Sequence, residues 1–66
     1  MKNRIKVERA EKNISQAELA DQIGVSRQTI NSIETGRYVP STILALKMAR
    51  VFDKRVEEIF QLEETD

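Results

Sequence analysis

The residues between Ser26 and Gly36 are expected to form a short helix with one polar face and one apolar face. The polar face carries hydrogen-bonding side chains at helical spacing: Arg27, Gln28, Asn31 and Ser32. Arginine can donate two parallel hydrogen bonds to O6 and N7 of guanine, and glutamine or asparagine can pair in the same way with N6 and N7 of adenine. These residue types on one helix face suit the reading of base edges in a DNA major groove.

A glycine turn is expected to hold this helix against a preceding one, within the segment 16–35. Gly24 stands where the connecting residue needs a positive φ, and Ala20 is small enough for two helices to cross closely. Four branched side chains would fill the inside of the pair: Ile23, Val25, Ile30 and Ile33. The second helix would then stand off the body of the protein with its polar face free, as in a helix-turn-helix.

Local signals mark the ends of the other helices. A first helix is predicted from about Arg4 to Lys12, with Ile5, Ala10 and Val7 turned inward and a left-handed end near Asn13. Ser15 followed by Glu18 predicts a capping box. Ser26 and Ser41 are further N-cap residues, which predict the starts of two later helices. Gly36 is expected to end the helix that carries the polar face, and Pro40 prevents its continuation. A fourth helix is predicted at about 42–52 and a short fifth at about 56–60.

Length and composition exclude several classes of protein. The 66 residues make one small domain, and they include no cysteine and no histidine. Disulfides, zinc sites with thiolate or imidazole ligands, and cysteine nucleophiles are therefore excluded, and no cofactor or metal is expected. No apolar run approaches the roughly 20 residues of a membrane span. We expect a cytoplasmic protein that does not act on membranes.

The charge distribution is uneven although the formal net charge is zero. Residues 1–55 hold all 11 Lys and Arg against 6 acidic residues, and residues 56–66 hold the other 5 acidic residues and no base. The acidic end cannot lie on phosphate and is expected to face away from DNA, or to be a solvated helix face and tail.

The fourth predicted helix is apolar around almost all of its circumference, which one small core cannot bury. The surplus predicts a self-complementary dimer interface, formed together with the C-terminal segment. Its expected residues are Ile43, Val51, Phe52, Ile59, Phe60 and Leu62. The alternative is a more central core helix with one or two exposed apolar residues.

The run from Ile5 to Phe60 resembles the Cro and lambda-repressor type helix-turn-helix family, also called the XRE family. The matching residues are 14–16, 18–20, 23–30, 33–34, 36, 40–41, 45–47, 49 and 57–60. The resemblance is closest to small stand-alone dimeric transcriptional regulators, and it implies an all-α, compact five-helix domain over residues 5–60 with an acidic tail at 61–66. Some members add a short antiparallel strand pair, which Lys2 to Arg4 and Gln61 to Glu63 could supply here. Glu8 departs from the pattern, because its place is often apolar.

By position, the resemblance implies base contacts from Arg27, Gln28 and Asn31. It also implies that Gln16 anchors the start of its helix on the DNA backbone and that Thr29 meets phosphate or a thymine methyl. Arg37 and Tyr38, in the loop after the third helix, are expected to supply a charge and a hydroxyl to the DNA backbone. Gln16 and Ser26 stand at helix N-termini, where free N–H groups favour phosphate. Tyr38 could instead pack against Pro40, and Glu34 is expected to pair within the protein because a carboxylate near phosphate is unfavourable.

The predicted function is sequence-specific DNA binding by a transcriptional regulator, a repressor acting as a homodimer on an inverted-repeat operator. One alternative is the antitoxin of a toxin–antitoxin pair that controls its own operon, which would add a regulatory protein partner. Another is a protein-interaction module that has lost DNA binding. An enzyme is not expected, because the chain has no phosphate-binding glycine loop and its adjacent glutamates diverge.

Overall fold

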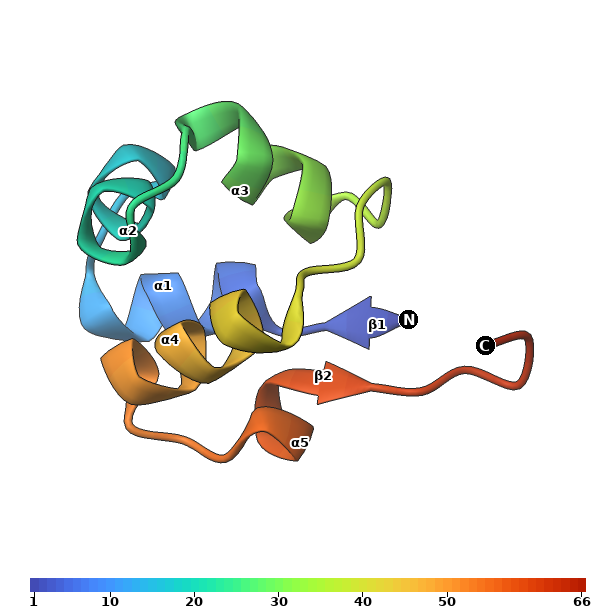
Figure 1. The fold of residues 1–66 in the computed structure, drawn as a ribbon. Coiled ribbons are helices and arrows are strands. Elements are labelled where there is room, and N and C mark those ends of the chain that lie inside the picture. The colour runs from blue at the N-terminus through green and yellow to red at the C-terminus, as the bar shows by residue number, and fades with distance from the viewer.

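Five helices and one pair of two-residue strands make up the computed structural model, which describes residues 1–66. In chain order the elements are β1 (Lys2–Asn3), α1 (Ile5–Lys12), α2 (Gln16–Ile23), α3 (Arg27–Glu34), α4 (Thr42–Phe52), α5 (Val56–Ile59) and β2 (Phe60–Gln61). Helices α2 and α3 lie together on one side of α1 and α4, while α5 and β2 lie on the other side and β1 leads into α1 (Figure 1). The predicted five-helix fold is confirmed.

The strands pair antiparallel, with Lys2 opposite Gln61 and Asn3 opposite Phe60. The first strand ends at Asn3, one residue before its predicted end, and the second begins at Phe60, one residue before its predicted start. Arg4 already caps α1, and its N–H donates to the Ile59 carbonyl at 2.8 Å. Phe60 takes an extended conformation as soon as α5 ends, so the second strand starts there.

Serine side chains cap three of the helices, as predicted. Ser15 Oγ accepts from the Glu18 N–H at 3.0 Å, and the Glu18 carboxylate accepts from the Ser15 N–H at 2.9 Å, which completes the capping box. Ser26 and Ser41 cap α3 and α4 in the same way. At the start of α5, the Arg55 N–H donates to Glu58, and this hydrogen bond lowers the pKa of the Glu58 carboxyl.

Left-handed residues end α1, α2 and α4. Asn13 has φ 57°, as the sequence predicted, and Asp53 has φ 53° at the end of α4. Gly24 has φ 76° between α2 and α3. Only glycine adopts this conformation without a steric cost at Cβ, so the predicted turn is confirmed.

The core is apolar apart from one carboxylate. Its buried residues are Ile5, Leu19, Ala20, Ile23, Ile30, Ile33, Met48, Phe52, Ile59 and Phe60, together with Glu8. Val7 and Ala10 are exposed, so the prediction that they turn inward is wrong. Ile5 and Glu8 lie three positions apart on the core face of α1, whereas Val7 and Ala10 fall on its other side. Glu8 is 3% exposed, and it lies 3.6 Å from Lys54 Nζ and 4.0 Å from Arg4 Nε.

Half of the predicted dimer residues belong to the core of the single chain. Phe52, Ile59 and Phe60 are 2%, 0% and 7% exposed, so they offer almost no surface to a second copy, and the predicted interface is corrected at these positions. Apolar side chains nevertheless remain on the surface. Ile43 and Leu46 of α4 are 66% and 56% exposed, as the composition of this helix predicted, and outside it Val39 and Leu62 are 62% and 82% exposed.

The two chain ends lie on the same side of the molecule (Figure 1). The N-terminal amine contacts carboxylate oxygens of Glu63 and Asp66, each at 3.0 Å, and these contacts raise its pKa. The pKa of Asp66 is lowered, first by the hydrogen bond from the Glu63 N–H and then by the amine. No helix has the length and apolar character that crossing a membrane requires.

Candidate nucleic-acid interface

Helix α3 divides into a buried face and an open face. Ile30 and Ile33 are buried against the core, while Arg27, Gln28 and Asn31 are exposed and Ser32 is half-buried. The N-cap serine holds the first turn, because Ser26 Oγ accepts from the Thr29 N–H at 3.1 Å. The structure therefore fixes the rotation of α3 so that its polar face points outward.

Two shallow hollows on the outer surface bring the predicted contact residues together. One is lined by Arg27, Gln28, Asn31, Ser32 and Arg37. The other is lined by Ser26, Gln28, Thr29, Ser32 and Tyr38. Gln16 joins them through hydrogen bonds to Asn31 and Arg27, so all nine predicted residues share one continuous surface over α3.

The loop after α3 is folded back onto the helix. The N–H groups of Arg37 and Tyr38 both donate to the Ser32 carbonyl, at 2.9 and 3.2 Å, and Gly36 supplies the positive φ of 80° that this turn needs. Arg37 is therefore held next to the polar face of α3. No acidic residue lines either hollow.

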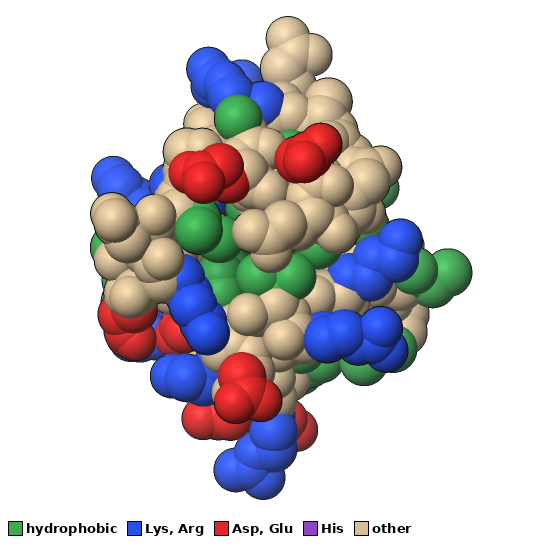
Figure 2. Space-filling model, turned by 90° about the vertical axis from the view of Figure 1, so that its left-hand side faces the viewer, with side chains coloured by type: hydrophobic (Ala, Val, Ile, Leu, Met, Phe, Trp, Pro, Cys, Tyr) green, Lys and Arg blue, Asp and Glu red, His purple; other side chains and the backbone are tan.

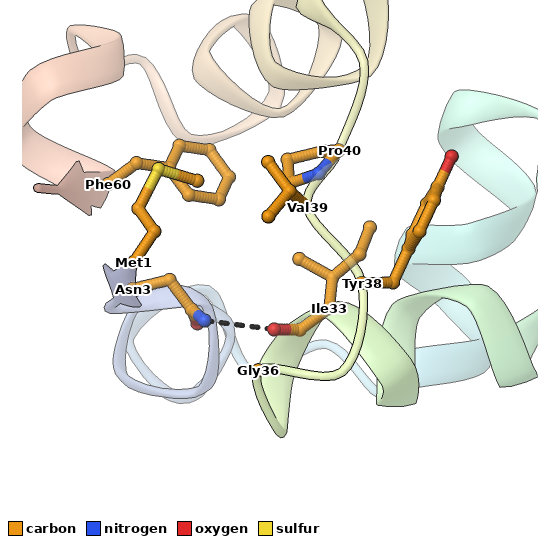
Figure 3. A pocket seen from close by; sticks show the side chains of 8 residues that line it. All are labelled: Met1, Asn3, Ile33, Gly36, Tyr38, Val39, Pro40 and Phe60. Atoms are coloured by element: carbon orange, nitrogen blue, oxygen red, sulfur yellow. Dashed lines mark hydrogen bonds between the residues drawn. The ribbon is translucent and has the colours of Figure 1, made fainter. Parts of the chain in front are cut away.

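Tyr38 stands between this surface and a small cavity on the other side of the loop. The cavity has a volume of about 20 Å³, which is room for one water molecule, and Pro40 and Ile33 also line it. Figure 3 shows the Tyr38 ring directed away from Met1 and Phe60. Tyr38 is 46% exposed, and it lines one of the hollows over α3.

Glu34 pairs within the protein, as predicted, and its partner is Arg9 of α1. Arg9 Nε donates to Glu34 Oε2 at 2.7 Å and Nη2 donates to Oε1 at 3.2 Å. Sequence reasoning missed Arg9. Its position four residues after Ile5, on the core side of α1, was the available signal.

Gln16 is occupied by neighbouring side chains rather than free. Its Nε2 donates to Asn31 Oδ1 and to Glu34 Oε1, each at 3.2 Å, and its Oε1 accepts from Arg27 Nη1 at 3.3 Å. An amide NH₂ has two hydrogens, so both are used. The backbone N–H at the start of α2 is the group of Gln16 that remains for phosphate.

On the face of the molecule that carries α2, Lys and Arg do not form one basic patch. Figure 2, seen from the side on which α2 lies in Figure 1, shows Lys and Arg scattered among acidic side chains around a central apolar area. The acidic C-terminal segment runs beside the strands and does not cover α3 (Figure 1). The described residues contain no cluster of side chains suited to hold a metal ion.

Comparison with known proteins agrees with this geometry. A family model described as helix-turn-helix matches residues 5–59. The chain is 48% identical over 64 residues to YgzD of Bacillus subtilis, an uncharacterized HTH-type transcriptional regulator, and the match covers 97% of each chain. An uncharacterized HTH-type transcriptional regulator of Methanocaldococcus jannaschii is 48% identical over 66 residues, with 100% of each chain covered.

A shorter match joins the chain to a viral protein. The ImmF control region 10 kDa protein of Bacillus phage phi105 is 50% identical over 38 residues, which cover 58% of this chain and 42% of the phage protein.

Three observations identify the family of this chain. The family model matches residues 5–59, the two regulators match over almost the full chain, and α3 presents its polar face outward. The chain belongs to the XRE-type helix-turn-helix family of small transcriptional regulators.

Proposed function

We propose that this protein is a sequence-specific DNA-binding repressor that binds an inverted-repeat operator as a homodimer. The observation that carries the proposal is the polar face of α3, where Arg27, Gln28, Asn31 and Ser32 line one exposed surface. The names of its full-length relatives support a regulatory role. Residues 5–60 would form the DNA-binding domain, and residues 61–66 an acidic tail that takes no part in binding.

Base reading is assigned to the exposed face of α3. Arg27 would bind a guanine, while Gln28 and Asn31 would each bind an adenine, and Ser32 would reach a neighbouring base edge. The DNA backbone would be held on both sides of this face by Gln16, Ser26, Thr29, Arg37 and Tyr38. These contacts would fix the register of α3 in the groove, while the base contacts select the sequence.

The homodimer is proposed from the apolar surface of α4. Ile43, Leu46 and Leu62 are more than half exposed, and Leu46 borders a groove of about 280 Å³ that is lined mostly by apolar side chains. A 66-residue chain has little core with which to offset such exposure, and a second copy would cover it. Two-fold symmetry would place the two α3 helices in successive major grooves, about 34–36 Å apart.

Selection of bound sequences from a random DNA pool at near-physiological salt tests this proposal, with the mass in solution measured on the same sample. A two-fold symmetric motif and a mass twice that of one chain are expected. Failure to recover any motif would contradict DNA reading and favour a protein-interaction module. A motif with a monomeric mass would contradict the homodimer and assign the apolar surface to a different protein, as the antitoxin alternative requires.

A further inference from the structure

The Glu34 carboxylate is the centre of a hydrogen-bond network that joins three helices. Its side chain is 7% exposed. Arg9 of α1 binds both of its oxygens, and Arg9 Nη1 also donates to the Ile14 carbonyl at 3.1 Å. The carboxylate is therefore held in one position by a guanidinium that is itself fixed at the corner between α1 and α2.

This carboxylate determines the orientation of the Gln16 amide. Gln16 Nε2 faces two oxygen acceptors, Glu34 Oε1 and Asn31 Oδ1, both at 3.2 Å. The opposite orientation would bring the amide oxygen against Glu34 Oε1, and a carboxylate oxygen cannot donate a hydrogen bond. The nitrogen must therefore face Glu34, and the amide oxygen faces outward.

The fixed amide then holds two of the proposed base-reading side chains. Asn31 Oδ1 accepts from Gln16, which leaves its NH₂ group free to donate to a base. Arg27 Nη1 donates to Gln16 Oε1, which leaves the other guanidinium donors free. Gln28 makes no side-chain hydrogen bond within the protein and stands outside this network.

We infer that Glu34 is a specificity-determining residue, which orients Gln16 and through it presents Asn31 and Arg27 to base edges without itself contacting DNA. This inference rests on the proposed function. Groups held in their binding conformation before the complex forms lose less conformational freedom on binding, and they reject wrong bases by keeping their geometry.

Glu34→Gln tests the inference with little change in shape. If the new amide keeps its oxygen on Arg9, its NH₂ group faces the NH₂ group of Gln16, and two donors oppose each other. Gln16 then turns or moves away, and Asn31 and Arg27 lose their partner. The base pairs read by each side chain are first assigned from the preferences that Asn31→Ala, Arg27→Ala and Gln28→Ala lose.

The expected result is selective. In Glu34→Gln, discrimination at the Asn31 and Arg27 base pairs falls about tenfold, whereas discrimination at the Gln28 base pair stays as in the wild type. Gln16→Ala gives the same selective loss, and adding Glu34→Gln to it causes no further loss, because Glu34 acts through Gln16. Ile59→Val serves as the control for stability, since it shortens a buried side chain outside the network and should leave discrimination unchanged.

Several results would overturn the inference. Equal loss of discrimination at all three base pairs in Glu34→Gln would show that the Arg9–Glu34 pair acts only on stability. Unchanged discrimination in Gln16→Ala would also overturn the inference, even if Glu34→Gln failed to fold, because Gln16→Ala keeps the buried Arg9–Glu34 pair intact. The side-chain amide signals of Gln16 and Asn31 in NMR spectra of the protein without DNA give an independent reading, and they should shift in Glu34→Gln. If the wild type selected no DNA motif, the proposed function would fail, while these signals would still decide the orientation of Gln16.

Discussion

Gln28 differs from its neighbours on the polar face of α3 because its exposed side chain has no hydrogen-bond partner within the protein. Asn31 and Arg27, by contrast, both share Gln16. Removal of the Gln28 amide should therefore change DNA reading alone, whereas removal of Asn31 or Arg27 also disturbs the network. This difference makes Gln28 the simplest position at which to test base reading.

Gln28→Ala is expected to abolish the preference at one base pair in each half-site. The lost discrimination should be about 1–3 kcal/mol, the usual contribution of a bidentate amide–adenine pair. The melting temperature and the weak binding to random DNA should not change, because no internal contact is lost. Competition between the selected operator and random DNA measures the effect, and equal weakening on both would remove Gln28 from base reading.

Arg37 is proposed to make the other type of contact, with a phosphate, which carries no sequence information. Arg37→Ala should weaken binding to every sequence and reduce the slope of log K against log salt by about one unit, as the loss of one phosphate contact does. Arg50→Ala, an exposed arginine in the second half of α4, is the matched control and should leave the slope unchanged. An Arg37 variant with the wild-type slope would exclude this contact.

At the scale of elements, the angle between α2 and α3 depends on one turn. A Cβ added at Gly24 would meet no atom within 4 Å, so the cost of a side chain there comes from the backbone conformation alone. Gly24→Ala should destabilise the protein by about 1–2 kcal/mol, the cost of a left-handed residue with a Cβ. A thermal melt should show a drop of roughly 4–8 °C for each kcal/mol in a chain of this size.

Gly24→Asn is the control for this turn, because asparagine tolerates the left-handed conformation better than alanine does. It should melt between the wild type and the alanine variant. If the alanine variant melted with the wild type, the positive φ at Gly24 would not be what limits the choice of residue.

Elements defined by short-range signals were predictable from the sequence, and contacts between distant elements were not. The capping box of Ser15 and Glu18 spans three residues, and the structure contains it as predicted. The prediction for the inward face of α1 was right for Ile5 and wrong for Val7 and Ala10. The sequence did not reveal that Glu8 is buried there, because a buried carboxylate is rare and the nearer of its two partners, Lys54, lies far along the chain. The network of Arg9, Gln16 and Glu34 joins three helices, and apart from the place of Arg9 on the core side of α1 no local pattern marks it.

The surface of the proposed dimer also depends on packing between elements, which local sequence signals do not reveal. Apolar excess in α4 predicted an exposed surface, and Ile43 and Leu46 provide it, while Leu62 is exposed in the C-terminal segment. The sequence could not show that the side chains of Phe52, Ile59 and Phe60 would be buried within a single chain, because their burial depends on how α5 packs against α4. The surface left for a partner is therefore smaller than the predicted one, and it includes Leu46, which was not among the predicted residues.

Leu46→Glu is expected to convert the proposed dimer into folded monomers. The new carboxylate would be buried without a partner in an apolar interface, which is costly, but in the monomer it would lie in water on α4. Loss of the second half-site contact should weaken binding to the inverted repeat by roughly 10²–10⁴-fold, while binding to a single half-site stays the same. Val7→Glu, which places the same charge on an exposed position of α1, should leave both the mass in solution and operator binding unchanged. A Leu46→Glu protein that kept the dimer mass would move the interface away from α4.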